Sequence, residues 1–362
     1  MSRLHTMETL TYRVSIEKVN CSRLTQVDLS NVPFGKVFSD HMFVAEYHSG
    51  GWQSAKIVPY GPIPMAPSAS ALHYGQAAFE GMKACKSPAG KPLLFRPTAN
   101  AQRINRSAQR LCMPTIPEEL FMQGLTELIR LDADWIAQDG QSVLYIRPIY
   151  FATDEFVGLK PSASYKFIII TCPVGLYYTE PVKLIVSQDY VRACEGGTGA
   201  AKVAGNYAAS LLADQEAKAQ GYDNVIWLDA LHRKYIEECG TMNLAFVIDN
   251  VLVTPKLTGT ILAGITRDSV LTLLRDQGIA VEERLIAIDE IVDAYQQGRL
   301  REAFGMGTAA TIAHISKIHY QGIDMNLPPV AQRQIANSVL EKLQRIKAGL
   351  DQDPYNWVMS IE

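Results

Sequence analysis

The sequence lacks the features that mark membrane, secreted and nucleic-acid-binding proteins. Its 34 lysines and arginines are balanced by 37 aspartates and glutamates, so no excess of positive charge is available to neutralise a phosphate backbone. The longest apolar stretch, residues 167–178, contains Thr171, Pro173 and Gly175 and is too short to span a bilayer. Residues 1–5 carry neither an apolar nor an arginine-rich leader. We therefore expect a cytoplasmic protein with no membrane or nucleic-acid partner.

Common ligand and catalytic signatures are also missing. The six cysteines include no CxxC pair, which disfavours a zinc site and a disulfide framework. The seven histidines include no HExxH sequence and no pair at ligand spacing, so no catalytic metal is expected. The chain has no GxSxG sequence either, which excludes the most recognisable class of hydrolase.

What the chain does have is the composition of an ordinary globular protein. Of its 362 residues, 48% are hydrophobic and 20% are charged, which is enough for a sizeable core, and the length favours two domains. Strand-like runs and helical periodicities alternate irregularly, which predicts a mixed α/β fold. Turn residues place the domain junction at 176–184, between an N-terminal domain (1–175) and a larger C-terminal domain (185–362).

The first half contains two predicted helices and two predicted buried strands. Residues 100–111 repeat apolar side chains at helical spacing, which leaves three arginines on the opposite, polar face: Arg103, Arg106 and Arg110. A second helix is expected at 120–136. Residues 142–147 and 165–171 have the apolar, β-branched character of buried strands, and Pro173 and Gly175 end the second.

The second half is punctuated more clearly by turn residues. A helix at 206–220 ends at Gly221, and a strand follows at 225–228. Asp249-Asn250 tolerates the positive φ of a two-residue turn and predicts a hairpin between strands 244–248 and 251–254.

Two further helices are expected toward the C-terminus. Thr266 is a suitable N-cap for a helix that stops at Gly278. Residues 329–350 have the amphipathic pattern of a last helix.

Two glycine-rich segments resemble nucleotide-binding loops and fail on detail. Residues 196–202 (GGTGAAK) end in lysine, but Ala201 and Val203 replace the glycine and the hydroxyl residue that a phosphate loop requires. Residues 305–310 (GMGTAA) match a dinucleotide pattern, but the β-branched sequence after them predicts a strand where that motif needs a helix. Neither an NTPase nor a dehydrogenase is favoured.

Lys202 is the most conspicuous candidate for chemistry. The small residues around it allow backbone and ligand to approach closely. A lysine amine is nucleophilic only in its neutral form, which a desolvated or electropositive site favours against an ordinary pKa of about 10.4. Composition alone leaves open the alternative of a solvated loop lysine.

Taken jointly, eight blocks resemble the branched-chain aminotransferases, which are pyridoxal-phosphate enzymes of fold type IV. Their common order and spacing carry the resemblance, whereas residues 1–33 match poorly. The resemblance implies a mixed α/β fold with two domains and an active site at their interface. The blocks are FGKVFSDHM (34–42), LHYGQAAFEGMKA (72–84), FRPTANAQRINRSAQRL (95–111), LYIRP (144–148), GGTGAAKVAGNY (196–207), EECGTMN (237–243), LAGITRDSVL (262–271) and FGMGTAA (304–310).

For the cofactor, the resemblance implies pyridoxal 5′-phosphate attached to Lys202, whose amine also moves a proton between the substrate Cα and the cofactor. A protonated ring nitrogen needs an acidic partner, and the family spacing E-x-G-T selects Glu238; Glu237 would point to the other face of an extended segment. Tyr207 would bond the phenolic oxygen, with core packing as its alternative. The phosphate would be held by Arg103, Ile265, Thr266 and Thr308.

For the substrate, the resemblance implies an apolar side-chain pocket lined by Phe34, Phe79, Tyr145 and Tyr177. The α-carboxylate would lie near Tyr74, Thr241 and Ala309. Arg147 would meet the side-chain carboxylate of 2-oxoglutarate or glutamate, with a structural ion pair as its alternative role. Val157 and Leu159 match a loop that enters the site from the other subunit, which implies a homodimer.

The expected reaction exchanges the amino group between leucine, isoleucine or valine and 2-oxoglutarate, giving a branched 2-oxo acid and glutamate. Two alternatives share Lys202 and Glu238 in the same fold, a D-amino-acid aminotransferase and an aminodeoxychorismate lyase. A third is a non-catalytic protein that binds a phosphate ligand and uses Lys202 only as a point charge. Mammalian members carry a redox CxxC where this chain has Ala310 and Ala313, so thiol regulation of that kind is not expected.

Overall fold

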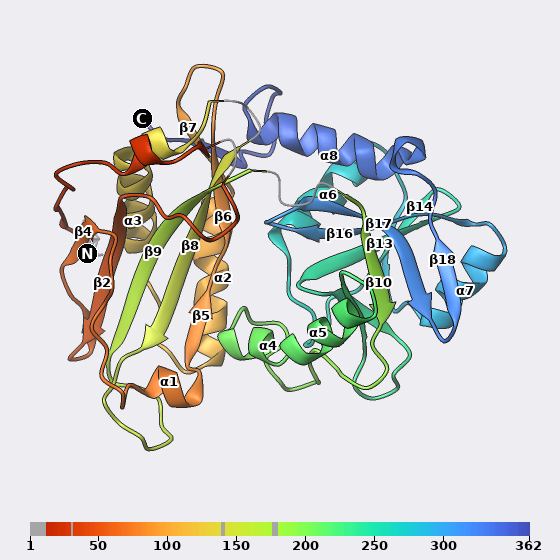
Figure 1. Cartoon of the computed structure of the whole chain (residues 1–362), viewed down its shortest axis with the longest axis horizontal. Coiled ribbons are helices and arrows are strands. Elements are labelled where there is room, and N and C mark those ends of the chain that lie inside the picture. Colours follow the sequence, from red (N-terminus) through yellow and green to blue (C-terminus); the bar gives the residue numbers. More distant parts are fainter. Residues whose placement is uncertain (1–11, 30–31, 139–141, 176–179) are drawn as a thin grey trace, which may run out of the picture.

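The chain forms two halves that lie side by side, each built on its own sheet (Figure 1). The computed structural model describes residues 12–29, 32–138, 142–175 and 180–362, so Tyr177 lies outside the described residues. The red-to-yellow half contains the N-terminal strands and the green-to-blue half the C-terminal strands. Two sheets with helices packed on them are the mixed α/β fold that the sequence predicts.

The N-terminal sheet is antiparallel except where its edge strand β1 pairs with β4. Strands β8 and β9 form its centre and pair along their whole length. In order across the sheet, the strands are β1 (Val14–Ile16), β4 (Ala55–Pro59), β2 (His41–His48), β9 (Tyr165–Val174), β8 (Val143–Ala152), β6 (Met82–Lys86), β7 (Pro92–Phe95) and β19 (Val358–Ser360), with β3 (Gly51–Trp52) on β2 and β5 (Ala77–Phe79) on β8.

Two long helices, α2 (Pro97–Arg110) and α3 (Glu118–Leu131), pack against this sheet over an aromatic core. Phe43, Phe121 and Phe167 are fully buried there, and the rings of Phe121 and Phe167 stack 5.5 Å apart. Each such side chain contributes about 1.5–3 kcal/mol to stability by leaving water. The short elements of this half are α1 (Ser70–Tyr74), η1 (Leu24–Gln26) and η3 (Ala133–Trp135).

Several predicted ends in this half are wrong. Strand β8 continues past the predicted end at 147 to Ala152. Strand β9 runs through Pro173 and ends at Val174, next to Gly175. Proline is tolerated because β2 pairs with β9 only as far as Ile169, so the missing N–H faces no second neighbour. The helix predicted at 120–136 ends at Leu131, because Asp132 leaves it to accept two hydrogen bonds from His41.

The C-terminal sheet closes on itself. Because β12 pairs with both β11 and β13, the strands between them form a ring whose apolar side chains pack in one cluster. In order, the strands are β12 (Ile236–Cys239), β11 (Asn224–Leu228), β10 (Val182–Val186), β17 (Thr311–Tyr320), β16 (Leu300–Gly307), β13 (Met242–Ile248), β14 (Val251–Pro255) and β15 (Val281–Arg284), with β18 (Ile323–Asn326) on β17.

Two predictions about these strands are confirmed. The hairpin is formed by β13 and β14, and its turn residues Asp249 and Asn250 have φ of 49° and 69°. The segment after Gly305–Ala310 is strand β17, as its β-branched composition predicts, and no dinucleotide-binding helix follows it.

The helices of this half surround the ring. They are α4 (Ala204–Ala208), α5 (Leu211–Ala219), α6 (Ile265–Asp276), α7 (Ile288–Gln296), η4 (Val330–Gln332) and α8 (Gln334–Lys347). Helix α8 is therefore shorter than the predicted 329–350, because its first residues form the separate turn η4. None of the described helices has the length and hydrophobicity needed to cross a membrane.

Two helix boundaries differ from the sequence prediction. The helix expected at 206–220 is divided into α4 and α5, because the N–H and hydroxyl of Ser210 both bond to the Tyr207 carbonyl and tighten the chain. The N-cap of α6 is Gly264, and Thr266 is already inside the helix. A Cβ at Gly264 would lie 1.9 Å from the side-chain oxygen of Asn243, so this close approach requires glycine.

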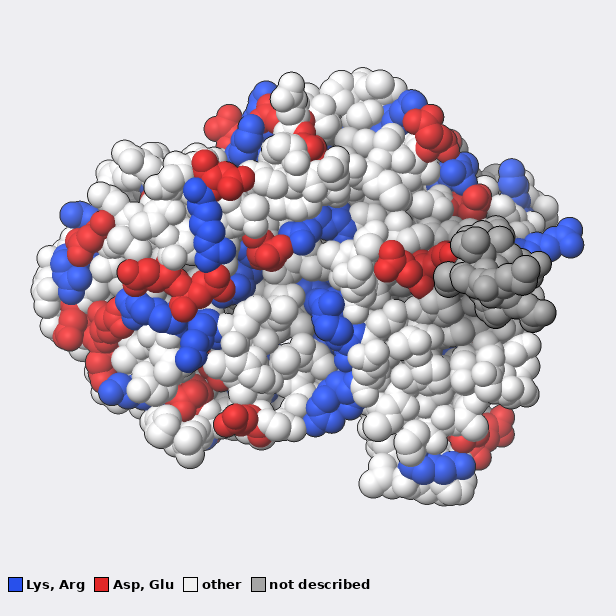
Figure 2. Space-filling model, turned by 180° about the vertical axis from the view of Figure 1, so that it is seen from behind, with Lys and Arg blue, Asp and Glu red and all other residues white. Residues whose placement is uncertain are grey.

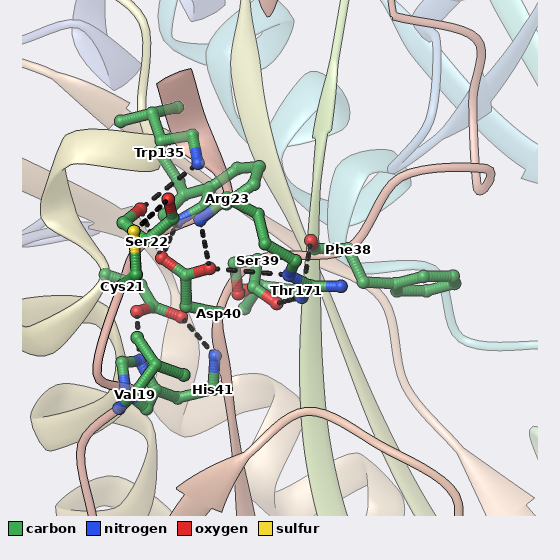
Figure 3. Close-up of polar contacts among 12 residues, drawn as sticks. Val19, Cys21, Ser22, Arg23, Phe38, Ser39, Asp40, His41, Trp135 and Thr171 are labelled. Atoms are coloured by element: carbon green, nitrogen blue, oxygen red, sulfur yellow. Dashed lines mark hydrogen bonds and ion pairs between the residues drawn. The ribbon is translucent and has the colours of Figure 1, made fainter. Parts of the chain in front are cut away.

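A buried polar network fixes the segment before β2 to the N-terminal sheet (Figure 3). The Asp40 carboxylate accepts hydrogen bonds from the Ser22 hydroxyl (2.5 Å), the Arg23 backbone N–H (3.0 Å) and the Trp135 indole (3.0 Å). Neighbouring His41 accepts the Val19 N–H at Nε2, so its Nδ1 must carry the proton that it donates to Asp132.

The two halves contact each other where strand β5 meets the residues just before helix α4. The Phe79 N–H donates to the Lys202 carbonyl, and Ala78 forms an isolated bridge with Val203. Strand β10 of the second sheet begins at Val182, inside the predicted linker 176–184, and β19 returns from the C-terminus to the first sheet. The division into domains at this linker stays a prediction.

Candidate active site

Lys202 lies where the two halves meet, held by its main chain. Its N–H donates to the Ser107 hydroxyl on α2 at 2.8 Å, and its carbonyl accepts the Phe79 N–H at 3.1 Å. The Asn206 side chain holds the glycine-rich loop before Lys202 in place. It forms hydrogen bonds with the Thr198 hydroxyl and with the carbonyls of Thr198 and Ala201. Backbone and loop thus fix where the Lys202 side chain starts.

The Lys202 amine is in a cleft of the protein interior. Nζ lies 2.6 Å from the Tyr207 hydroxyl and within 5.0 Å of the ring centroids of Phe79 and Tyr207. The same cleft is lined by Arg103, Glu238 and the loops that contain Thr266 and Thr308. The cleft therefore brings together the amine of Lys202, the phenol of Tyr207, the carboxylate of Glu238 and residues that suit an anion.

Glu238 is a buried carboxylate on β12 with few donors. Its Oε1 accepts the Leu262 N–H at 2.8 Å and the Asn243 amide at 3.4 Å, and Arg192 Nε lies 3.3 Å from Oε2. Burial raises the pKa of Glu238 above its ordinary value, and the Arg192 charge offsets part of this effect. The remaining face of the carboxylate lines the Lys202 cleft.

Glu237, the alternative acid, points elsewhere. Its Oε1 accepts the Thr260 hydroxyl, and it lines none of the clefts around Lys202 in the described part of the chain. Burial also raises the pKa of Glu237. Alternation along β12 thus separates the two carboxylates, but both faces of the strand are buried.

Arg103 is buried, so its expected place on a polar helix face is wrong. It forms a bidentate ion pair with Glu80, at 2.6 Å from Nε and 2.8 Å from Nη2, and its Nη1 donates to the Ala263 carbonyl. Arg106 and Arg110 are exposed. Burial alone would raise the pKa of Glu80, but the Arg103 charge lowers it below its ordinary value. The contact with Glu80 explains why one arginine of the three turns inward.

An anion-binding corner adjoins Arg103. Ile265 and Thr266 form the first turn of α6, whose N-terminus has no side-chain cap, and Thr308 lies in the turn after β16. All three line the cleft together with Arg103 and Lys202. Free N–H groups and the positive end of the helix dipole suit a phosphate.

Aromatic rings and an arginine continue from this cleft into the N-terminal half. Phe79 packs edge-on against Tyr207 at 4.7 Å, and the Arg147 guanidinium lies 4.9 Å from the Phe79 ring. Arg147 also donates to the Tyr145 hydroxyl at 3.0 Å, and Tyr145 packs against Phe34. Phe79 and Tyr207 contact Lys202, and Arg147, Tyr145 and Phe34 follow in a continuous series of contacts that contains one positive charge.

The other predicted substrate residues divide into two groups. Thr241 lines the Lys202 cleft. Ala309 follows Thr308 in the chain but lines a neighbouring cavity, where its carbonyl accepts a hydrogen bond from Lys83. Tyr74 instead donates to the Val157 carbonyl, on a surface where Val157 and Leu159 are 61% and 85% exposed. That group lines none of the clefts around Lys202 within the described residues.

Four residues of the site were missed by the sequence reasoning. Glu80 and Arg192 pair with Arg103 and Glu238, Asn243 bonds to Glu238, and Ser107 holds the Lys202 main chain. Glu80, Ser107 and Asn243 lie inside blocks that carry the resemblance, and Glu80 is an evident candidate for the partner of Arg103. Arg192 lies outside all the blocks, and nothing in the sequence marks it.

The N-terminal sheet, the closed C-terminal sheet and a lysine cleft between them define the class of this protein. Residues 77–318 match the family model "Amino-transferase class IV", which spans more than half of the chain. The chain belongs to this family. Class IV aminotransferases depend on pyridoxal phosphate, and the amine, phenol, acid and anion corner of the cleft fit that cofactor.

Comparison with individual proteins narrows the family further. The chain is 44% identical to branched-chain-amino-acid transaminase 1 of Bacillus subtilis (strain 168) and 46% identical to branched-chain-amino-acid aminotransferase 2 of the same organism. Each match covers 92% of this chain, with 95% and 93% of the relatives. The chain is therefore a member of the branched-chain amino acid aminotransferases, as its sequence blocks indicate.

Solved structures agree with this fold. The branched-chain aminotransferase of Thermoproteus uzoniensis with norvaline matches with a TM-score of 0.75 at 27% identity, over 89% of this chain and all of that one. The branched-chain amino acid aminotransferase from Escherichia coli matches with a TM-score of 0.71 at 28% identity, over 89% of this chain and 99% of that one. The predicted fold type and enzyme class are thereby confirmed.

Proposed function

We propose that this enzyme exchanges the amino group between leucine, isoleucine or valine and 2-oxoglutarate, giving the branched 2-oxo acid and glutamate. The observation that carries the proposal is the Lys202 amine, 2.6 Å from Tyr207 in a cleft shared with Glu238 and Arg103. The names of the relatives supply the substrate class. The aromatic side chains beside Lys202 agree with that substrate class, because they suit a substrate whose side chain is apolar.

Lys202 and Tyr207 are the residues proposed to handle protons. Bound pyridoxal phosphate supplies an electron-withdrawing ring that stabilises negative charge on the substrate Cα. Lys202 would attach the cofactor through its amine and would move the proton at Cα, and the hydrogen bonds of its main chain to Ser107 and Phe79 hold the start of its side chain in place. Tyr207 holds the cofactor's phenolic oxygen by the hydroxyl that now contacts Nζ.

Glu238 is proposed to hold the proton on the ring nitrogen. A carboxylate with a raised pKa shares a proton readily with a basic nitrogen, and the Arg192 charge offsets part of the effect of burial on the pKa of Glu238. Arg103, Ile265, Thr266 and Thr308 are proposed to bind the phosphate. Arg103 is held in position by Glu80, so its guanidinium is preorganised.

The substrate side chain is proposed to lie against Phe34, Phe79, Tyr145 and Tyr177. The α-carboxylate would contact Thr241 and Ala309. Arg147 would form a charge-assisted contact with the side-chain carboxylate of 2-oxoglutarate or glutamate. Its Nε is buried and forms no hydrogen bond with any described residue, so it has a donor to offer.

We also propose a cytoplasmic homodimer in which Tyr74, Val157 and Leu159 act together. These residues are exposed and connected by the hydrogen bond from Tyr74 to the Val157 carbonyl. Covering them by a second subunit would remove apolar surface from water and bring Tyr74 toward the partner's substrate carboxylate. The measurement is the mass in solution, and a monomer with full activity would contradict this part.

The proposed reaction is tested by substrate profiling with glutamate formation as the readout. L-Leucine, L-isoleucine and L-valine should each support turnover with 2-oxoglutarate. Turnover of D-alanine with none of L-leucine would favour a D-amino-acid aminotransferase, and pyruvate release from aminodeoxychorismate would favour the lyase. The purified protein should be yellow, and borohydride should fix the cofactor on Lys202; no adduct on Lys202→Ala is the matched control. A colourless protein without an adduct would favour a phosphate-ligand binder.

A further inference from the structure

A second, larger cavity lies behind the phosphate corner. Its volume is about 700 Å³, within the range of small-molecule sites, and it is bounded by β6, β7, the β16–β17 turn and α8. Ile265, Thr266 and Thr308 line both this cavity and the Lys202 cleft and so lie between them, whereas neither Lys202 nor Glu238 lines the larger cavity. Basic side chains gather along the groove between the two halves on the back of the molecule (Figure 2).

Two lysines from opposite sides of the fold meet in this cavity. Lys83 on β6 donates to the Ala309 carbonyl at 2.5 Å, and Lys347 at the end of α8 donates to the Thr311 hydroxyl at 3.1 Å. The Lys347 ammonium also lies 4.8 Å from the Phe95 ring. All of these partners are uncharged.

Neither lysine has an ion pair with a carboxylate among the described residues. The other cations of α8 differ, because both Lys342 and Arg345 pair with Asp351. An enclosed ammonium without a counter-charge is rare, since the protein must compensate for lost hydration. Lys83 and Lys347 are therefore placed as ligands for a negative group.

The ionisable groups that line the cavity give it a net positive charge near neutral pH. Burial lowers the pKa of Lys83 to about 8, and burial together with the Lys83 charge lowers that of Lys347 to about 7. On β17, burial lowers the pKa of His314 to about 4, so it is neutral; on β6, burial raises the pKa of the Cys85 thiol. The remaining charged residues that line the cavity are Arg345, paired with Asp351, and exposed Glu341.

We propose that this cavity binds a small doubly charged oxyanion, a phosphate or a dicarboxylate, between the ammonium groups of Lys83 and Lys347. One charge on each side matches a ligand with two negative charges, and the Thr311 hydroxyl can add a donor. The ligand would bridge α8 and the N-terminal sheet. It would also draw Lys83 from the Ala309 carbonyl, which couples this site to the turn that carries Thr308.

The experiment is calorimetric binding of inorganic phosphate, and separately of succinate, to the holoenzyme at pH 6.5 and constant ionic strength. Saturation of the enzyme with pyridoxal phosphate keeps the cofactor's own phosphate corner filled. Lys347→Gln should weaken binding at least tenfold, and Lys342→Gln, on the same helix but paired with Asp351, should leave it unchanged. The phosphate and succinate titrations identify which oxyanion the cavity prefers.

Several outcomes would overturn the proposal. One is that neither phosphate nor succinate binds saturably to the wild-type protein. Another is that Lys347→Gln binds them as tightly as the wild-type protein does. A third is that 2-oxoglutarate displaces succinate while Lys347→Gln leaves succinate binding unchanged, which would place succinate in the substrate site. If Lys347→Gln fails to fold, Lys347→Arg should retain binding. Succinate is largely a dianion at both pH values, so raising the pH from 6.5 to 9.5 should weaken succinate binding to the wild-type protein at least tenfold as the lysines lose their protons. Binding that is independent of pH would contradict the proposal, while leucine transamination tests the enzyme separately.

Discussion

Asp40 and Glu238 are both buried carboxylates, with 4% and 3% of their surface exposed, yet their pKa values move in opposite directions. Burial acts on Asp40 too, but hydrogen bonds from Ser22, Arg23 and Trp135 outweigh it and lower the pKa. Asp40 also lies beneath a partly exposed arginine, whereas Glu238 lines a cleft formed by residues of both halves of the molecule. The number and kind of donors, not burial alone, distinguish a structural carboxylate from one suited to holding a cofactor proton.

The largest expected difference between the two carboxylates is in catalysis. Glu238→Gln should lower kcat by about 100-fold or more, because the ring nitrogen loses its acidic partner. Asp40→Asn should leave kcat unchanged, and Glu237→Gln should have a much smaller effect than Glu238→Gln. Steady-state transamination of leucine measures all three. Equal losses in the two glutamate variants would contradict the assignment of Glu238.

The next difference concerns cofactor retention by the arginines of α2. Arg103→Ala should lose pyridoxal phosphate far more readily than Arg110→Ala, because only Arg103 lines the cleft. Removing Arg103 also leaves Glu80 as an unpaired buried charge, so Arg103→Lys, which keeps the charge, should be intermediate. Cofactor absorbance after dialysis is the measurement. Similar retention by the Arg103→Ala and Arg110→Ala variants would remove the proposed role.

Stability should change by different amounts at the two carboxylates. Asp40→Ala should reduce the free energy of unfolding by about 2–3 kcal/mol, since it leaves the buried Trp135 indole N–H without its acceptor. Glu238→Gln should reduce the stability of the cofactor-free protein by less, because glutamine can still accept the Leu262 N–H, and Arg192 keeps its hydrogen bonds to the Gly199 and Thr260 carbonyls after it loses its ion pair. Urea unfolding compares the variants. A loss at Glu238 as large as that at Asp40 would show that the Glu238 charge is structural.

The smallest expected effect is the pH dependence of the Asp40 contribution. Its pKa is lowered on folding, so its stabilisation is fully present above the ordinary value of 3.8 and disappears as pH falls through the folded-state value. The difference in unfolding free energy between wild type and Asp40→Asn should therefore shrink on going from pH 6 to pH 3. Urea titrations at the two values measure it, and a constant difference would mean that Asp40 acts by packing alone.

Local patterns predicted most of the elements but not all of their ends. The Asp249–Asn250 turn and the strand after Ala310 depend on backbone preferences that neighbours in sequence carry. The end of α3 at Leu131 and the passage of β9 through Pro173 depend instead on His41 and on where β2 stops. Those partners are distant in sequence, so periodicity could not anticipate them.

The candidate site shows the same division. The resemblance of the sequence blocks to the family indicated Lys202, Tyr207 and Glu238. Helical periodicity alone predicted that Arg103 lies on the exposed face of its helix, where it does not lie. Arg192 carries no local mark and becomes meaningful only 3.3 Å from Glu238.

By itself, the sequence determined the mixed α/β composition, the turn positions and the ordered blocks that assign the chain to its family. Only the tertiary structure decided which charges are buried, which of them have partners, and that Lys83 and Lys347 share a cavity. The physical reason is that desolvation and Coulomb energies depend on distance and surroundings in space. Residues far apart along the chain set both, and no pattern within a short segment contains them.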